Sequence, residues 1–239
     1  MLPALLEREA YVEAELAHRR RSIALYSEAS LLAEQSRNAQ NRPDRLLLAM
    51  SAAAEIVRNA VALGDMAMAE DALGRARTMR QRAQPGAYAA AWDAVVSAAE
   101  AEMHQARGRR AEAETKLRET ISSLEAMETR RKEGLKVSHA SVYRAQLVAP
   151  NAALARLLNS NWRYAEAETH ARTALSEALD LYGPYHRDVL LAGGTMTDIV
   201  LSQGRYEETR QLAAALLRVG EMQTLPATHP RMRALRLNY

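Results

Sequence analysis

The chain has 239 residues, of which 48% are apolar and 26% are charged, and its formal net charge is +3. This composition excludes an intrinsically disordered chain, and it lacks the strong positive charge of a dedicated nucleic-acid binder. The absence of cysteine excludes disulfides and thiolate chemistry, and Glu7 and Glu9 come too early for the apolar core of a signal peptide.

Apolar side chains recur along the whole chain with the spacing of a helix. Good helix formers such as Ala, Leu, Arg and Glu dominate, whereas there are only 10 Gly and 7 Pro. We find no segment with the patterning of a strand. The i, i+3 and i+4 periodicity predicts helices over residues 3–37, 43–63, 65–83, 87–106, 110–131, 140–159, 163–182, 186–203, 206–220 and from 229 onward.

An Arg-Tyr-x-Glu phrase recurs between these helices. The tract "WRYAEAETHARTAL" starts at Trp162, and "GRYEETRQLAAALL" starts 42 positions later, at Gly204. Looser copies start at Glu9, Gly64 and Gly108. Most copies lie between two apolar stripes, so the repeating unit is a helix, a tight turn and a second helix. Glycine at the turn allows the left-handed conformation that ends the first helix.

The links between units carry recurring histidines and prolines. His139, His186 and His229 lie at equivalent places, and we expect them to cap or staple helices. Pro150 lies inside a helical stripe and should kink or split that helix. The prolines that lie in links, where they end one helix or begin the next, are Pro43, Pro85, Pro184 and Pro230.

Helix pairs with small residues at their packing positions resemble the tetratricopeptide repeat. Ala167, Ala171 and Ala174 follow Tyr164 at the spacing of this repeat. The link "GPYHRDV", followed by an apolar helix and "GRYEET", resembles more specifically the longer variant of kinesin light chains. Similar arrays in bacterial proteins are attached to caspase-like peptidase, kinase or nucleotide-switch modules. The resemblance implies an all-α fold of the α-α superhelix class, a solenoid of antiparallel helix pairs.

Three features depart from the pattern of the repeat. Trp162 replaces a glycine, Thr209 replaces an alanine, and Gly193 and Gly194 stand where a larger side chain is usual. We expect Asn161 to supply the left-handed conformation in place of the missing glycine, since Asn is the usual substitute. The glycine pair predicts a close helix contact or a bend, and a ligand-facing notch is the alternative.

The repeats predict one helical-repeat domain over residues 1–239. The chain opens on the second helix of a unit and closes on the start of a first helix. We therefore expect a fragment of a longer protein, or an array whose uncapped ends dock on a partner or on a second copy. The expected units are 43–84, 87–131, 139–182 and 186–220, with partial units at 1–37 and 229–239.

No motif points to catalysis, so we expect no enzymatic activity, no cofactor and no metal site. The tract "LAGGTMTD" has no lysine of a phosphate-binding loop, and neither His104 nor His170 has a His or a carboxylate four residues later. Glutamates gather at the starts of second helices, where the helix dipole favours them. The longest apolar stretches, such as residues 46–54, are far shorter than a membrane span. A cytoplasmic protein without a membrane partner is expected.

Short basic runs leave nucleic acid as an alternative partner. In the longest run the arginines spread around the helix instead of forming one stripe, which favours a solvated surface. A DNA- or RNA-binding helical repeat remains the alternative interpretation. The runs are at residues 18–21, 75–82, 107–110 and 130–132.

Recognition is expected on the first helices, which line the inner face of such a superhelix and bind peptides there. The inward positions include Arg58, Arg156, Asn159 and Asp198. The two arginines suit an acidic segment, because a guanidinium binds a carboxylate with two hydrogen bonds. The alternative is that all four are ordinary solvated residues.

We therefore predict a non-enzymatic scaffold that binds a protein or peptide, as the sensor or docking part of a larger regulatory protein. The alternative function is the regulatory arm of a caspase-like peptidase or a kinase whose catalytic domain lies outside this chain. The charge and spacing of the residues do not name the partner.

Overall fold

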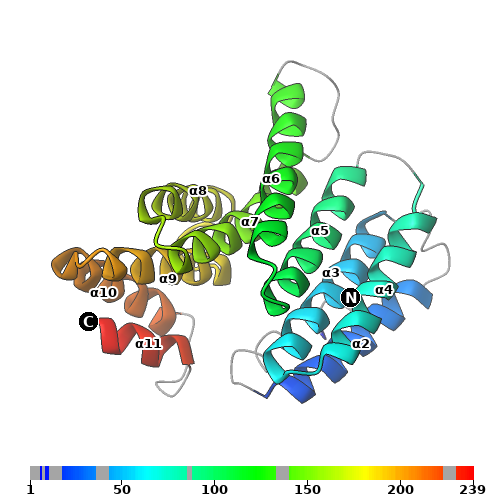
Figure 1. Cartoon of the computed structure of the whole chain (residues 1–239), viewed down its shortest axis with the longest axis horizontal. Coiled ribbons are helices and arrows are strands. Elements are labelled where there is room, and N and C mark those ends of the chain that lie inside the picture. Colours follow the sequence, from blue (N-terminus) through cyan, green and yellow to red (C-terminus); the bar gives the residue numbers. More distant parts are fainter. Residues whose placement is uncertain are drawn as a thin grey trace. The chain divides into compact units, whose positions relative to one another are not determined.

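The computed structural model describes residues 6, 9–10, 18–35, 43–84, 88–132, 140–222 and 230–239, and all regular structure in this part of the chain is helical (Figure 1). The all-α prediction is confirmed. From residue 43 onward, each helix begins and ends within two residues of its predicted bounds. The helices are α2 (Arg19–Gln35), α3 (Pro43–Leu63), α4 (Met66–Arg82), α5 (Ala89–Ala106), α6 (Arg110–Lys132), α7 (Ala140–Ser160), α8 (Tyr164–Tyr182), α9 (Arg187–Ser202), α10 (Tyr206–Met222) and α11 (Pro230–Asn238).

The chain divides into two compact units, unit 1 with residues 1–143 and unit 2 with residues 144–239. The boundary falls inside α7. Helices that follow one another pack side by side, as α3 does with α4 and α5 with α6 in unit 1, and as α9 does with α10 in unit 2. These are the helix–turn–helix pairs predicted from the repeat. The expected grouping of all residues into one domain stays a prediction.

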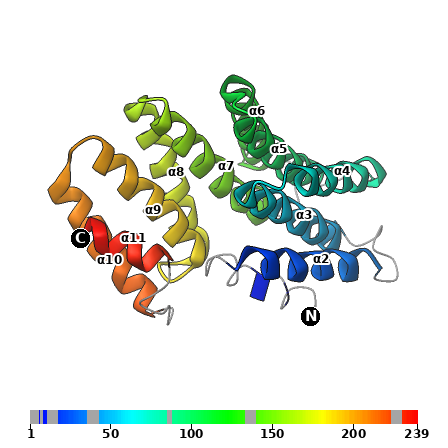
Figure 2. The same cartoon turned by 60° about the horizontal axis from the view of Figure 1, so that its bottom comes forward.

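Unit 1 is built around α3, which contacts α2, α4 and α5 (Figures 1 and 2). The helix begins at Pro43, whose fixed φ suits the first helical position, and Asp44 lies beside the positive end of the helix dipole. Met50, Ile56 and Val57 are almost completely buried. Small side chains between them let the helices approach closely. The alanines in this core include Ala49, Ala52, Ala53, Ala60, Ala69, Ala72 and Ala76.

Within the described residues, α3 is the one helix that is long and apolar enough to cross a membrane, with a mean hydropathy of 1.6 over its most apolar window. This differs from the expectation based on residues 46–54, which considered only the uninterrupted apolar run. Of that window, 44% is buried. The contacts with α2, α4 and α5 account for this burial, and central helices of globular proteins reach the same length and hydropathy.

The N-terminal part of unit 1 differs from the continuous helix predicted over residues 3–37. His18 is not helical, and α2 begins at the next residue. Arg21 Nη2 lies 3.3 Å from Glu9 Oε1, whereas residues this far apart in one helix are separated by about 18 Å along its axis. One helix therefore does not join Glu9 to Arg21, and the prediction was wrong. Periodicity could not reveal this, because Ala10 and the buried face of α2 enter the same core.

The turn between α7 and α8 has no glycine, and Trp162 adopts the left-handed conformation there, with a φ of +62°. The prediction that Asn161 would do so was wrong. The amide of Trp162 donates to the carbonyl of Asn159, and the amide of Arg163 donates to the carbonyl of Leu158. These two bonds end a helix when the residue after its cap is left-handed, and they place that residue at position 162. Glycine has the same conformation in the other turns, at Gly64, Gly108 and Gly204.

The helices of unit 2 stack on one another (Figure 2), and three small apolar clusters join them. Each cluster draws residues from three consecutive helices, so α7, α8 and α9 pack together, as do α9, α10 and α11. The small side chains again bring the helices close. The clusters are Val148 with Ala178 and Val189, Ala152 with Ala174 and Ala192, and Leu190 with Ala213, Leu216 and Leu235.

Pro150 does not split α7, contrary to one expectation, and the helix continues through it. Asn151 Nδ2 donates to the carbonyl of Leu147 over 3.0 Å, in the turn that the proline ring and its missing N–H disturb. His170 of α8 holds Asn151 in turn, because its Nδ1 lies 2.8 Å from Asn151 Oδ1. The side chain of Asn151 therefore supports the helix where proline weakens it.

The two adjacent glycines of α9 differ in their surroundings. A Cβ atom on Gly193 would lie 2.5 Å from Leu216 Cδ2 of α10, whereas a Cβ atom on Gly194 would have nothing within 4 Å. The predicted close helix contact is confirmed for Gly193. Gly194 faces open space, and a ligand-facing notch stays a prediction there.

Candidate functional site

Three of the four predicted binding residues lie close together in unit 2. Arg156 and Asn159 lie near the end of α7, and Asp198 lies on α9. Arg156 precedes Asp198 by the 42 positions that separate Trp162 from Gly204, so the two occupy equivalent places in consecutive units. We define the first-helix face of unit 2 as the exposed or half-buried residues Ala149, Ala153, Arg156 and Asn159 of α7 with Gly194, Asp198 and Ser202 of α9.

A short hydrogen-bonded chain joins the two helices on this face. Asn159 Nδ2 donates to Ser202 Oγ over 3.3 Å, and Ser202 Oγ donates to the carbonyl of Asp198 over 2.8 Å. Because the hydroxyl proton of Ser202 is used, Asn159 turns its NH₂ group rather than its oxygen toward Ser202. Asn159 Oδ1 is sheltered from solvent and has no hydrogen-bond partner among the described residues. The face therefore contains an unfilled acceptor.

The carboxylate of Asp198 lies beside this chain. Its side chain reaches the surface, yet the surrounding atoms desolvate the carboxylate, and this burial raises the pKa of Asp198 above its ordinary value. The positive charge of Arg156 offsets part of that effect. The face thus places one anion and one cation at equivalent positions of neighbouring first helices.

The fourth predicted residue, Arg58, lies on α3 in unit 1, and carboxylates already engage its guanidinium. Nη1 donates to Glu55 Oε1 over 2.8 Å, and Nε lies 3.4 Å from Glu102 Oε1 of α5. The charge of Glu55 raises the pKa of Arg58 above its ordinary value, so the side chain stays cationic. An acidic peptide would compete with two internal carboxylates here, and a binding role for Arg58 stays a prediction.

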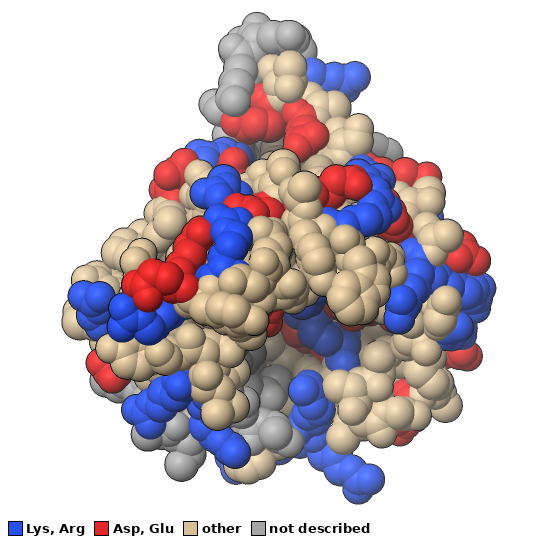
Figure 3. Space-filling model, turned by 60° about the vertical axis from the view of Figure 1, so that its left-hand side comes forward, with Lys and Arg blue, Asp and Glu red and all other residues tan. Residues whose placement is uncertain are grey.

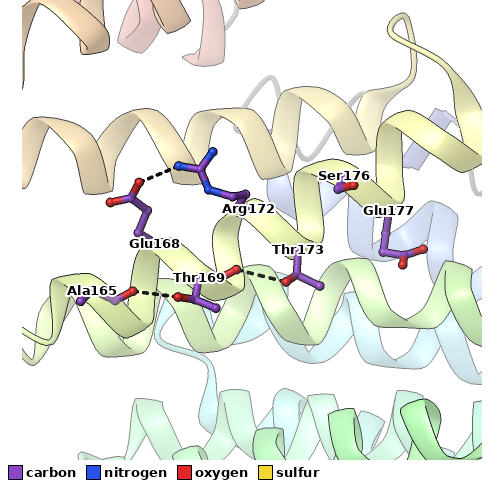
Figure 4. A pocket seen from close by; sticks show the side chains of 7 residues that line it. All are labelled: Ala165, Glu168, Thr169, Arg172, Thr173, Ser176 and Glu177. Carbon is purple, nitrogen blue, oxygen red and sulfur yellow. Dashed lines mark hydrogen bonds and ion pairs between the residues drawn. The ribbon is translucent and has the colours of Figure 1, made fainter.

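A shallow depression runs along the surface of α8, the second helix of its pair (Figure 4). Thr169 donates to the carbonyl of Ala165, Arg172 donates to Glu168, and Arg144 of α7 donates to Glu177 over 2.7 Å. Arginines therefore hold both carboxylates of the depression, which is unsuited to acid–base chemistry. Its lining is Ala165, Glu168, Thr169, Arg172, Thr173, Ser176 and Glu177.

The sequence analysis did not single out this depression. Its residues recur every three or four positions between the buried alanines of α8, a spacing typical of the solvent face of an amphipathic helix. That spacing could have indicated an exposed stripe. It could not have indicated a hollow, because a hollow depends on the neighbouring elements.

The histidine at the start of α9 confirms one prediction for the links. His186 Nδ1 accepts a hydrogen bond from the amide of Asp188 over 3.3 Å, and its ring stacks on Tyr182 with 4.0 Å between centroids. His186 is therefore a helix cap. His139 and His229 lie outside the described residues. In the part of the chain that is described, no three His, Asp or Glu side chains gather into a group that could hold a metal ion.

Several arginines of the basic runs pair with neighbouring carboxylates. Arg77 Nη2 lies 2.7 Å from Glu100 Oε1 of the next helix, and Arg107 pairs with Glu70. Figure 3 shows basic and acidic side chains interspersed over the face it presents. This face is therefore not uniformly positive, as a surface that binds nucleic acid would be. Further pairs in the longest run join Arg75 to Asp71 and Arg80 to Asp93.

Helix pairs joined by tight turns, with small residues at the contacts and with pairs that stack within each unit, define the class of this fold. It is the tetratricopeptide-like helical-repeat fold of the α-α superhelix class, which confirms the resemblance found in the sequence. Comparison with solved structures supports the same class. BtubC (BKLC) from P. vanneervenii superposes with a TM-score of 0.59 at 15% identity, over 95% of this chain and 81% of that one.

More distant matches include two further proteins. A putative kinesin light chain from Podosopora anserina, with nearly identical TPR-like repeats, matches with a TM-score of 0.41 at 15% identity, over 92% of this chain and 96% of its own. The apo form of RapI matches with a TM-score of 0.39 at 12% identity, over 100% of this chain and 71% of its own. No protein-family model and no curated protein matches the chain. The similarity therefore establishes the fold alone.

Proposed function

We propose that the protein is a non-enzymatic scaffold that binds a peptide segment of a protein partner on the first-helix face of unit 2. The observation that carries this proposal is the exposed carboxylate of Asp198 on α9, which no described residue pairs, together with the sheltered and unfilled acceptor of Asn159 on the neighbouring first helix. The α8 depression is the contrasting case, since its carboxylates are already paired. Unfilled polar groups favour a ligand because a bound partner can satisfy them.

The wider role follows from the class of protein. A repeat scaffold without catalytic groups acts by docking, so we propose that it serves as the sensor or docking part of a cytoplasmic regulatory protein. The alternative is the regulatory arm of a caspase-like peptidase or a kinase encoded outside this chain. A His/Cys dyad or a kinase catalytic loop in the coding sequence beyond Tyr239 would favour that alternative. Self-association through the ends of the array is a further possibility that light scattering would test.

A displayed library of random peptides tests the proposal with the intact chain as the target. We expect peptides that bind the wild type and that lose binding when Ala149→Trp places a bulky neutral side chain on the first-helix face. Ala165→Trp is the matched control, because Ala165 is also exposed on a helix but lies in the α8 depression. Loss of binding with Ala165→Trp alone would move the site to α8, and a library without binders would refute the proposal.

A further inference from the structure

The first-helix face of unit 2 has an excess of hydrogen-bond acceptors. Asn159 Oδ1 has no partner, and its own NH₂ group is already used by Ser202. Among the described residues, the carboxylate of Asp198 forms no hydrogen bond or ion pair, and only the nearby charge of Arg156 acts on it. A ligand that fills these sites must therefore bring donors.

The two acceptors belong to residues that one hydrogen-bonded chain joins. Ser202 Oγ accepts from Asn159 Nδ2 and donates to the backbone carbonyl of Asp198. Asp198 and Ser202 are one helical turn apart on α9, or roughly 6 Å along the axis. A carboxylate that is partly desolvated gains more from a cation than one in bulk water, because the local dielectric constant is lower.

We propose that the first-helix face of unit 2 binds a lysine or arginine side chain of the partner peptide, held by the exposed carboxylate of Asp198. The inference rests on the proposed function and names the chemistry of its partner. It reverses the acidic preference expected from the sequence, which considered Arg58 and Arg156 without the carboxylates beside them. Arg156 then acts as a nearby like charge that opposes an incoming basic side chain at Asp198.

A preference for a basic ligand side chain and a preference for an acidic one predict opposite changes in affinity for the same substitutions. A basic ligand side chain loses its counter-charge in Asp198→Asn, so we expect binding about tenfold weaker. The opposing charge is removed in Arg156→Gln, so we expect binding about threefold tighter. An acidic ligand would instead bind Asp198→Asn more tightly and Arg156→Gln more weakly. Asp180→Asn, on the exposed surface of α8, is the matched control and should leave binding unchanged.

The probes are peptides selected from the displayed random library on the intact wild-type chain, then synthesised and titrated by fluorescence anisotropy. Each lysine or arginine of a selected peptide is replaced by glutamine, in combination with wild type and Asp198→Asn. We expect one basic position whose replacement weakens binding to wild type but has little further effect on Asp198→Asn, because the two groups interact directly. Circular dichroism shows whether each variant retains its helix content.

The outcomes separate this inference from the proposed function. Selected peptides that bind Arg156→Gln more weakly and Asp198→Asn more tightly would overturn the basic preference while supporting a peptide-binding face. Selected peptides with no basic position coupled to Asp198 would also overturn it. A folded chain that selects no peptide would overturn the proposed function, and the inference with it.

Discussion

At the scale of the single residue, Trp162 holds a backbone conformation that glycine holds in the equivalent turns. A side chain costs roughly 1–2 kcal/mol in the left-handed region because its Cβ crowds the backbone. The indole is 79% exposed and touches Tyr164 edge-on, so it recovers little of this cost by burial. We expect Trp162→Gly to be more stable than Trp162→Ala by about 1 kcal/mol, since both lose the indole and only glycine relieves the backbone.

Urea denaturation of the two variants measures this difference without interference from the lost aromatic contact. Gly204→Ala is the reciprocal control. Its free energy of unfolding should fall by a similar amount, because Gly204 has a φ of +73° and open space around its Cα. Equal stabilities of Trp162→Gly and Trp162→Ala would show that the turn relaxes to another conformation when the indole is removed.

Sequence reasoning succeeded at single residues when the deciding neighbours were close in the chain. His186 was expected to cap α9, and its partner Asp188 is two positions away. Arg58 shows the limit. The residue was placed at an inward position, but its ion pair with Glu102 joins two helices, and no local pattern predicts which distant carboxylate meets a given arginine. The unfilled acceptor of Asn159 was hidden for the same reason.

At the scale of the helix, the two glycines of α9 should respond in opposite ways to the same change. Gly194→Ala adds a methyl group where nothing lies within 4 Å, so it should stabilise the protein by about 0.5–1 kcal/mol through its higher helix propensity. Gly193→Ala drives Leu216 from its place against α9, and this overpacking should cost roughly 1–3 kcal/mol. Thermal unfolding of both variants checks the pair, and destabilisation by Gly194→Ala would contradict the open space seen there.

Glu168 connects α8 to the turn that precedes α10. It accepts hydrogen bonds from Gln203 Nε2 at 2.9 Å and from Arg205 Nη1 at 2.7 Å, and its side chain is 18% exposed. The bond from Gln203, with those from Arg172 and Arg205, holds the pKa of Glu168 below its ordinary value. Glu168→Gln removes the charge from these bonds and should destabilise the protein by about 1 kcal/mol at neutral pH.

The lowered pKa of Glu168 also fixes the sign of its pH dependence. Its stabilisation is fully present above the ordinary glutamate pKa of about 4.3, and it is lost as the pH falls through the lower value of the folded state. The free energy difference between wild type and Glu168→Gln should therefore shrink in acid. Glu207→Gln is the control, because its pair with Arg210 is well exposed and should matter little. A constant difference across pH would contradict this account.

Helix positions were predictable because apolar periodicity reports which face of a helix is buried, and here nearly every helix buries one. The break before α2 escaped detection because Ala10 and the buried face of α2 lie in one core, so apolar residues recur on both sides of the break. The continuity of α7 through Pro150 escaped it because a side-chain bond from Asn151 supports the helix there. The break before α2 and the continuity of α7 both depend on contacts that the pattern of apolar residues does not reveal.

At the scale of the whole molecule, the apolar clusters of the described residues join helices that are near neighbours along the chain. The apolar residues around Ile56 belong to α2, α3, α4 and α5 and to Ala10, all in unit 1. Those of α9 pack with α7, α8, α10 and α11 in unit 2. A repeat protein built in this way has a stability close to the sum of its units and of the interfaces between adjacent units. A destabilising core substitution should therefore weaken mainly the unit that contains it.

Two matched core substitutions test that expectation by amide hydrogen exchange. Ile56 and Ile199 are both almost completely buried, the first in unit 1 and the second in unit 2. Each change to alanine should cost about 2–5 kcal/mol by leaving a cavity. We expect Ile56→Ala to speed exchange in α2 to α5 and to leave α9 and α10 protected, and Ile199→Ala to do the reverse. Equal loss of protection in both units from either substitution would contradict this expectation and show that the chain unfolds as one cooperative unit.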